Sequence, residues 1–398
     1  MRFKVSIFLT LSVLVLSALI SGCGTSLFSS KPVEYQKAEV LFEATSPSAL
    51  QEGQKLQIEF LDDVTGLAFN PLRFDMIQKG ERTFYYKTTL TLHSNVKYRY
   101  IKGGQNVTVE LNPGGEQIRF RLLNIDDPIT VSDSIAAWPE EPFSGETGTI
   151  AGQFYDKANN TPLPNLLVTA QGIQAITASD GSFRLQGVNA GTHLITVMAL
   201  DGSYKDFQQQ AVVAGNAITP VYVGLEKRPL VNVTFEAILP EGLAPSTELR
   251  IASNMYSLGN LYSDVYAGST ILSADLPVMQ KLANGTYSLT LALPAGAYFN
   301  YKYSLGDGFW NSELTSGSTF EVREFIVPDS NTIQKDTIRA FQAPNSGLVT
   351  FNVTVPASTP VEDIVTIQFN PFDWLAPIPM ARVDATHWTF VLYNPQGY

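Results

Sequence analysis

Apolar and polar residues alternate with a period of two along most of the chain. Residues 40–47, 233–240 and 349–356 share this pattern, and each segment stops at a proline. Successive side chains of a strand point to opposite faces, and proline cannot donate to a strand ladder, so each segment predicts a strand with one buried face. No long segment has the period of an amphipathic helix. The pattern therefore predicts an all-β protein built of tandem antiparallel β-sandwich domains.

Further anchor positions recur after each of these strands. A methionine comes shortly before a basic residue, and an aromatic residue follows that methionine by eight positions. In the first two copies a Tyr-x-Tyr segment follows the methionine by 22 positions, and the closing segments also match. These agreements indicate an internal repeat. The anchors are Met76, Met279 and Met380; Lys79, Lys281 and Arg382; Phe84, Tyr287 and Trp388; 98–100 and 301–303; 133–138 and 336–341.

The repeat divides the chain of 398 residues, whose length alone predicts two to four domains. Two copies span 38–139 and 229–342, a third and incomplete copy spans 347–398, and a different segment, 147–228, separates the first two. Counting 22 residues from Met380 leads to position 402, beyond the last residue. We therefore expect a longer parent chain with an aromatic-x-aromatic pair near that position.

The segment 147–228 has a signature of its own. It opens with residues 148–152, and the pair Asp180-Gly181 predicts a tight hairpin between two strands because glycine accepts a positive φ. A second turn is predicted at 189–191, before the strand 194–197. This order resembles the carboxypeptidase regulatory-like domain. The resemblance implies a transthyretin-like sandwich that serves as a non-catalytic spacer or binding support.

The N-terminus has the form of a secretory signal. Arg2 and Lys4 precede an apolar run, 5–20, that is short for a membrane-spanning helix. Residues 19–23, Leu-Ile-Ser-Gly-Cys, resemble the lipobox of bacterial lipoproteins, and Cys23 is the only cysteine. The resemblance implies a signal peptide, 1–22, lipidation of Cys23 and a tether, 23–37; a buried structural cysteine is the alternative. We expect a cell-envelope protein, lipid-anchored to a bacterial membrane and facing outward.

The second repeat carries a series of short motifs in a fixed order. They are 233–235, 239–240, 258–260, 301–303, 309–310 with Glu313, and 326–328. With these motifs the segment 231–330 resembles the family-20 starch-binding modules, although Leu261 stands where that family has a loop tryptophan. The first repeat has no tryptophan after its Tyr-x-Tyr segment, and its Trp138 lies in a segment with the pattern of a core strand.

Five residues are candidates for contact with a sugar. A sugar ring presents an apolar face that stacks on aromatic rings, and its hydroxyls bond to charged or amide groups. Alternation along 301–303 directs the two tyrosines to the core and Lys302 outward. For each aromatic candidate the alternative is packing in the core or on the rim of a sandwich. The candidates are Trp310 and Lys302, which the resemblance pairs at one site, and Trp374, Tyr256 and Tyr262.

The composition narrows the classes of function. A net charge of −11 with no long basic run argues against nucleic-acid binding. The three histidines, His93, His193 and His387, are scattered, so we predict no metal site and no cofactor. The sequence has no Gly-x-Ser-x-Gly elbow and no phosphate loop. We expect no enzyme within these residues, while a longer parent could carry a catalytic domain downstream.

Together these patterns predict non-catalytic binding of a polysaccharide, with α-glucan as the suspected ligand, by a lipid-anchored protein of the cell surface. Several modules on one chain would strengthen sites that are individually weak. The alternative is a structural stalk or adhesin-type array of sandwiches that binds no sugar, and the missing loop tryptophan favours it.

Overall fold

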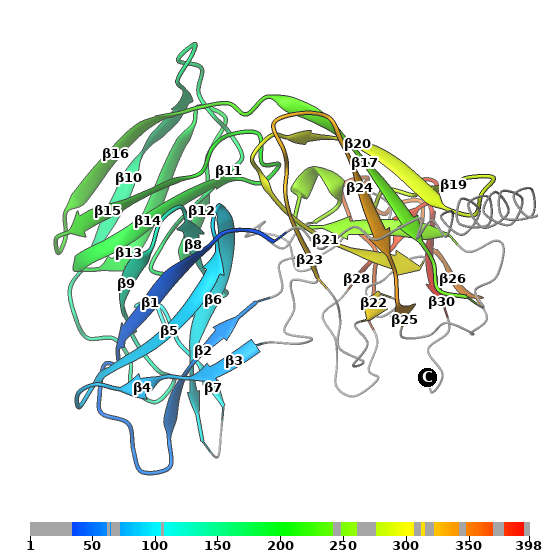
Figure 1. Cartoon of the computed structure of the whole chain (residues 1–398). Helices are drawn as coiled ribbons and strands as arrows, with labels where there is room; N and C mark the ends of the chain where they lie inside the picture. Colours follow the sequence, from blue (N-terminus) through cyan, green and yellow to red (C-terminus); the bar gives the residue numbers. More distant parts are fainter. Residues whose placement is uncertain are drawn as a thin grey trace, which may run out of the picture.

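The computed structural model describes residues 34–61, 64, 72–104, 107–241, 248–260, 276–305, 312–314, 322–341, 348–368 and 378–393. Apart from one turn of 3-10 helix, η1 (Tyr256–Leu258), all regular structure in these ranges is β-strand (Figure 1). The predicted all-β fold with tandem sandwiches is confirmed. None of the helical structure in these ranges is long and apolar enough to cross a membrane.

The first sandwich contains two sheets around one core. One sheet has the order β4-β5-β1-β9, and the other has the order β3-β2-β6-β7, with β8 also paired to β6. Burial alternates along β1, so Val40 and Phe42 face the core, which Trp138 helps to close. The strands are β1 (Lys37–Thr45), β2 (Lys55–Phe60), β3 (Leu72–Asp75), β4 (Ile77–Gln78), β5 (Thr83–Thr91), β6 (Ser94–Gly103), β7 (Thr108–Val109), β8 (Arg121–Ile125) and β9 (Ile129–Ser134).

The second sandwich pairs a three-stranded sheet, β13-β10-β16, with a four-stranded sheet, β12-β11-β14-β15. A tight turn forms at Gly181, whose φ is +74°, but it joins β12 to β13 in the opposite sheet. The predicted pairing of these two strands in a hairpin is therefore wrong. The turn residues determine where the chain reverses direction, but they do not determine which sheet the next strand enters. The strands are β10 (Thr147–Asp156), β11 (Leu166–Ala170), β12 (Ile173–Ile176), β13 (Ser182–Asn189), β14 (Gly191–Ala199), β15 (Phe207–Val213) and β16 (Ile218–Leu225).

The third sandwich repeats the plan of the first. Its sheets are β19-β20-β17-β24 and β18-β21-β23, with the short pair β22-β25 beside them. Phe235, Phe299 and Tyr301 pack together in its core. The strands are β17 (Leu230–Ile238), β18 (Leu249–Ser253), β19 (Gln280–Lys281), β20 (Tyr287–Pro294), β21 (Tyr298–Leu305), β22 (Glu313–Leu314), β23 (Arg323–Ile326), β24 (Thr332–Thr337) and β25 (Ala340–Phe341).

The C-terminal strands form two small sheets, β26-β30-β29 and β27-β28. Val349 of β26 pairs with Leu392 of β30, and Val233 of β17 pairs in the same way with Leu291 of β20. The first strand pair of the incomplete third repeat, 347–398, thus has the same register as the first strand pair of the second repeat, which forms the third sandwich. Its strands are β26 (Leu348–Thr354), β27 (Thr366–Ile367), β28 (Ile378–Pro379), β29 (Ala381–Arg382) and β30 (His387–Tyr393).

The recurring methionine and aromatic anchors occupy equivalent core positions in the three copies, whereas Lys79, the basic anchor predicted for the first copy, lies one residue beyond the position that pairs with the aromatic. Each methionine is buried, and the residue shortly after it pairs with the buried aromatic of the next strand. The pairs are Gln78 with Phe84, Lys281 with Tyr287, and Arg382 with Trp388. In the last two pairs the cation also lies over the aromatic ring, 5.6 Å and 5.3 Å from its centroid.

One strand pair in each of the first three sandwiches is parallel, which the prediction of antiparallel sandwiches did not include. The pairs are β1 with β9, β10 with β16, and β17 with β24. In the first and third sandwiches, the opening strand is thereby held between an antiparallel partner from the middle of the domain, β5 or β20, and a late strand of the same domain.

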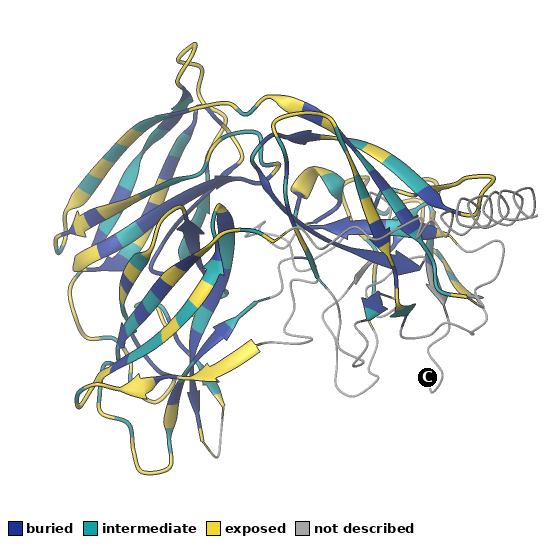
Figure 2. Cartoon of the chain, viewed as in Figure 1, coloured by how far each residue is buried: buried dark blue, intermediate teal, exposed yellow. Residues whose placement is uncertain are grey.

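The first two sandwiches dock through both apolar and polar contacts. Phe120 and Leu122 of the first pack with Leu167, Met198 and Leu200 of the second. The backbone N–H of Asn124 donates to Oε1 of Gln208 over 2.9 Å, and Nε2 of Gln208 donates back to the Asn124 carbonyl. Figure 2 shows buried residues running through both sandwiches, where the two lie side by side. This interface holds them in one orientation.

Candidate functional site

Most of the predicted functional residues lie outside the described part of the chain. Cys23, Tyr262, Trp310 and Trp374 fall in ranges about which the structure gives no account. Lys302 and Tyr256 remain, and the structure places them very differently.

Lys302 is wholly buried, so the prediction that it faces outward is wrong. It does point away from Tyr301 and Tyr303, as alternation requires. All eight residues of β21 are buried, however, so both faces of the strand are covered. Beside it on the outer face, Ala252 packs with Leu276 and with Val64 of the first sandwich. The sequence pattern of one strand cannot report that a neighbouring domain covers its second face.

The Tyr-x-Tyr strand instead belongs to a buried cluster of polar side chains in the third sandwich. The hydroxyls of Tyr301 and Tyr303 donate to Oδ2 of Asp336 over 2.6 Å and 2.8 Å. Arg323 donates to Glu313 over 2.7 Å and to Asp336 over 3.2 Å. Burial and the Asp336 carboxylate raise the pKa of Tyr301, which therefore stays protonated as a donor.

The first sandwich contains the same cluster. Tyr98 and Tyr100 each donate to Asp133 over 2.8 Å, and Arg121 donates to Glu110 over 2.7 Å and to Asp133 over 3.0 Å. The five positions have the same spacing as in the third sandwich, apart from one residue at the arginine. The cluster is buried in both domains, so its role is to hold the two sheets together.

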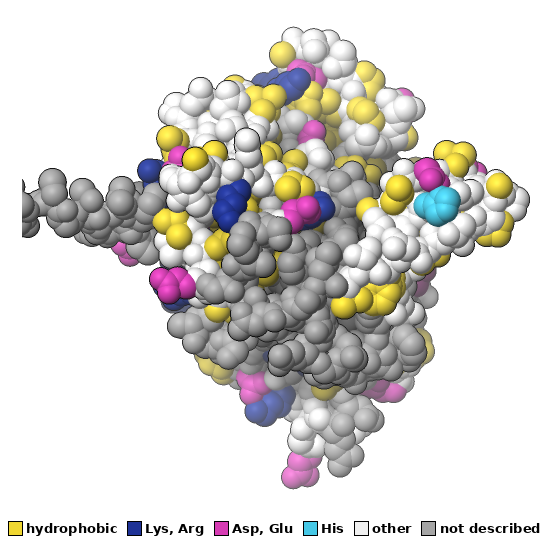
Figure 3. Space-filling view, turned by 90° about the vertical axis from the view of Figure 1, so that its right-hand side faces the viewer, with side chains coloured by type: hydrophobic (Ala, Val, Ile, Leu, Met, Phe, Trp, Pro, Cys, Tyr) yellow, Lys and Arg dark blue, Asp and Glu magenta, His cyan; other side chains and the backbone are white. Residues whose placement is uncertain are grey.

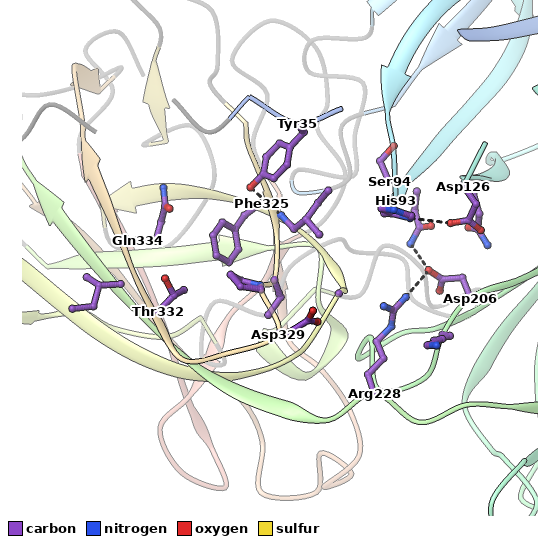
Figure 4. Close-up of a pocket in the computed structure, with 18 of the residues that line it drawn as sticks. Tyr35, His93, Ser94, Asp126, Asp206, Arg228, Phe325, Asp329, Thr332 and Gln334 are labelled. Carbon is purple, nitrogen blue, oxygen red and sulfur yellow. Dashed lines mark hydrogen bonds and ion pairs between the residues drawn. The ribbon is translucent and has the colours of Figure 1, made fainter. Parts of the chain in front are cut away.

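Among the clefts that described residues line between the docked domains, one has a volume of about 960 Å³. This junction cleft lies between the first three sandwiches (Figure 4). Figure 4 shows the ring of Tyr35 beside Phe325, where its hydroxyl accepts the backbone N–H of Ile326 over 3.1 Å. This bond joins the segment before β1, which contains Tyr35, to the third sandwich.

Polar side chains from different domains meet at one side of the junction cleft. Asp206 accepts from Asn95 and from Arg228, each over 3.4 Å (Figure 4). Burial raises the pKa of Asp206 to about 6, and Arg228 only partly offsets this effect. His93 lies 3.3 Å from Asp126. These groups engage one another, whereas both polar side-chain atoms of Asn124, which also lines the cleft, are buried and make no hydrogen bond to a described residue.

The second cleft has a volume of about 770 Å³ and contains Tyr256, the predicted residue that is described and exposed. We call it the Tyr256 cleft. It lies between η1 of the third sandwich and the second sandwich, and the backbone N–H of Tyr256 donates to the Leu200 carbonyl over 2.9 Å. Its lining residues are Thr161, Pro162, Leu163, Pro164, Asn165, Leu166, Ile176, Ala199, Leu200, Asp201, Ser203, Tyr204, Tyr256 and Ser257.

The Tyr256 cleft combines an exposed ring with polar groups. Tyr256 is 42% exposed, and Asn165 and Asp201 are also exposed. Asp201 accepts the Ser203 N–H over 3.0 Å through one oxygen, which leaves the other for a ligand. Tyr204 donates to Asp156 over 3.0 Å, and burial with this carboxylate raises its pKa to about 12. Sequence reasoning missed Asn165 and Asp201 because domain docking, and no local motif, brings them to Tyr256.

The histidines form no metal centre in the described ranges, which contain no group of three or more His, Cys, Asp or Glu side chains that could hold an ion. His193 is buried and contacts the Asn189 carbonyl over 2.7 Å. His93 and His387 are each paired with an exposed aspartate.

The comparisons with known proteins add little to this geometry. No family model matches the sequence, and no curated protein matches it. Among solved structures, the Bacillus anthracis TIE protein is 12% identical over 76% of this chain, with a TM-score of 0.20, and this chain spans half of its length. A streptococcal ancillary pilin is 10% identical over 76% of this chain and 99% of its own, with a TM-score of 0.24.

A glycoside hydrolase family 15 glucoamylase from Hypocrea jecorina is 16% identical over 31% of this chain and 20% of its own, with a TM-score of 0.22. Because these TM-scores are at most 0.24, none of the three likenesses bears on function.

Proposed function

We propose that the chain is a non-catalytic, polysaccharide-binding protein that a lipid at Cys23 anchors to the bacterial cell envelope. The observation that carries the binding proposal is the exposed ring of Tyr256 at a cleft of about 770 Å³. Ligand sites are concave and mostly apolar, with a few polar groups that fix the orientation of the ligand. The Tyr256 cleft meets this description among the described residues.

The chemistry of the cleft suits a sugar. A phenol ring offers a flat apolar surface for the C–H face of a sugar ring. Pro162 and Pro164 add apolar surface, while Asn165 and Asp201 can bond to hydroxyls. The suspected ligand is an α-glucan, on the resemblance of the third sandwich to starch-binding modules.

A pull-down on insoluble starch tests the binding proposal. We expect the full-length protein in detergent to be retained, and Tyr256→Ala to lose most of that retention. Tyr222→Ala is the matched control, because Tyr222 is 69% exposed on β16 and does not line the cleft. Equal retention of the two variants, or no retention of the wild type on any polysaccharide, would contradict the proposal.

The anchor is tested separately. Cys23→Ser removes the thiol that would receive the lipid, so the protein should leave the membrane fraction or remain unprocessed. Unchanged membrane fractionation would refute the lipoprotein part of the proposal and would leave the binding part standing.

A second candidate function is a rigid spacer without sugar binding. The docking of the first two sandwiches favours it, because a shared apolar core and the paired bonds between Asn124 and Gln208 resist bending. Domains on one chain are otherwise expected to move relative to one another. Retention on starch that depends on Tyr256 decides between the two functions.

A further inference from the structure

We infer that the Tyr256 cleft is a two-domain site for a neutral polysaccharide, in which the second sandwich supplies the hydrogen-bonding wall. This inference rests on the proposed function. It specifies the class of ligand and identifies the second sandwich as the other half of the binding site. The segment 147–228 would then take part in recognition and would be more than a spacer.

The two walls are held at a fixed separation. The Leu200 carbonyl at the end of β14 accepts the Tyr256 N–H over 2.9 Å, and this bond joins the base of the cleft. Close packing reinforces it, because a Cβ added at Gly202 would lie 2.9 Å from the terminal methyl of Met255. Tyr256 and residues of the loop 161–166 therefore line one cleft without a need for domain movement.

The second sandwich presents exposed side chains whose donors and acceptors can bond to a sugar. Asn165 is exposed at a φ of +60°, and no described group bonds its side-chain amide. An amide both donates and accepts, so it can bond two sugar hydroxyls at once. Asp201 adds a carboxylate oxygen, and hydrogen bonds to a charged acceptor are the stronger kind. Tyr256 and Ser257 offer two hydroxyls from the other wall.

The charge of the site selects against acidic ligands. Asp201 is the one charged side chain among the described residues that line the cleft, and no lysine or arginine lines it there. On the face shown in Figure 3, most of the described basic side chains lie singly and next to an acidic one. With a net charge of −11 on the whole chain, a polymer of uronic acids would be repelled. A neutral chain of hexoses would not be repelled.

The test compares binding of amylopectin and of polygalacturonate to the detergent-solubilised full-length protein. We expect amylopectin to bind with an affinity that is unchanged between about 50 and 500 mM salt, because no ion pair is made. Polygalacturonate should bind at least about tenfold more weakly. Asn165→Gly keeps a residue that tolerates a positive φ and removes the amide, so amylopectin affinity should fall about three- to tenfold with an unchanged thermal midpoint.

Asn216→Gly is the matched control, because Asn216 is exposed at a φ of +54° in a turn away from the cleft. It should bind as the wild type does. Asp201→Asn provides a second variant on the same wall, with an expected loss of similar size.

The outcomes separate the inference from the proposed function. If the wild type and Tyr256→Ala behave as proposed while Asn165→Gly and Asp201→Asn bind normally, the two-domain site is wrong and a one-domain site remains. Stronger binding of polygalacturonate than of amylopectin overturns the ligand class. Failure of the wild type to bind any polysaccharide overturns both.

Discussion

The hydroxyl of Tyr301 donates a hydrogen bond of 2.6 Å to the carboxylate of Asp336, deep between the two sheets of the third sandwich. Tyr98 and Asp133 make the equivalent bond, of 2.8 Å, in the first sandwich. Each bond joins the Tyr-x-Tyr strand to the strand that lies parallel to the opening strand. The duplicated polar cluster therefore ties late elements of each sandwich to its core.

We predict that Tyr301→Phe lowers the free energy of unfolding by about 1–3 kcal/mol, because it leaves a buried carboxylate with one donor fewer. Chemical denaturation of the full-length protein measures this change. Tyr222→Phe, at a residue 69% exposed, should change stability by less than about 0.5 kcal/mol. Equal effects of the two substitutions would show that the buried bond contributes nothing net.

A second prediction concerns Lys302, which is fully buried. Lys302→Ala should destabilise the protein by about 2–5 kcal/mol, the range for truncation of a long buried side chain, and the folded fraction should still bind glucan. Thermal unfolding and starch retention measured on the same samples separate these effects. The control is Lys335→Ala in the same sandwich, where a pair of the exposed lysine with the half-buried Glu236 at 3.4 Å should contribute at most about 1 kcal/mol.

Loss of starch retention by a Lys302→Ala protein of normal stability would instead support the contact between Lys302 and a sugar that the family resemblance implied. Such a result would require the lysine to become accessible when a ligand binds.

Much of the fold follows from periodicity alone. The alternation at Val40 and Val233, and the spacing from each methionine to its aromatic, identified equivalent strands that the structure places at equivalent core positions. These features are local, since strand period and turn chemistry act over a few residues. The parallel pairs and the sheet that β13 enters depend on contacts across the whole domain, and no short pattern reports them.

The candidate site was less predictable for the same reason. Tyr256 stood out as an aromatic beside a loop motif, but its partners Asn165 and Asp201 lie 91 and 55 residues away in the sequence. The backbone bond from Tyr256 to Leu200 and the close packing of Gly202 against Met255 bring them together. Burial of Lys302 has the same origin, because alternation distinguishes two faces of a strand and does not say whether the second face is covered.

A third prediction concerns Gly152, where β10 and β16 approach each other closely. A Cβ at this position would overlap the carbonyl oxygen of Val221, which is backbone and cannot turn aside. Gly152→Ala should therefore cost about 3 kcal/mol or more, at the upper end of over-packing effects, by separating the parallel pair. Hydrogen exchange should show the loss of protection concentrated in β10 and β16.

Gly114→Ala is the control for this substitution, because the nearest atom to its added Cβ would be a side-chain oxygen of Asn112 at 3.2 Å. It should unfold close to the wild type. A Gly152→Ala protein as stable as this control would mean that the two strands pair less closely than described.

The last prediction uses the pKa of Asp206, which burial raises from 3.8 to about 6. Between these values the folded protein holds a proton on this carboxyl that the unfolded chain has released. Stability from this group therefore falls as the pH rises from about 4 through 6, because the buried carboxyl must then ionise. Asp206→Asn keeps the shape of the side chain and cannot ionise, so it should remove this pH dependence.

The measurement is the difference in free energy of unfolding between Asp206→Asn and the wild type at several pH values. This difference cancels the titration of every other group that the substitution leaves unchanged. Relative to the wild type, the variant should gain stability as the pH rises from about 4 to 7, even though Arg228 loses its charged partner at 3.4 Å. A difference that does not vary over this range would mean that Asp206 titrates normally, and that water or Arg228 compensates fully for its burial at the junction of the three sandwiches.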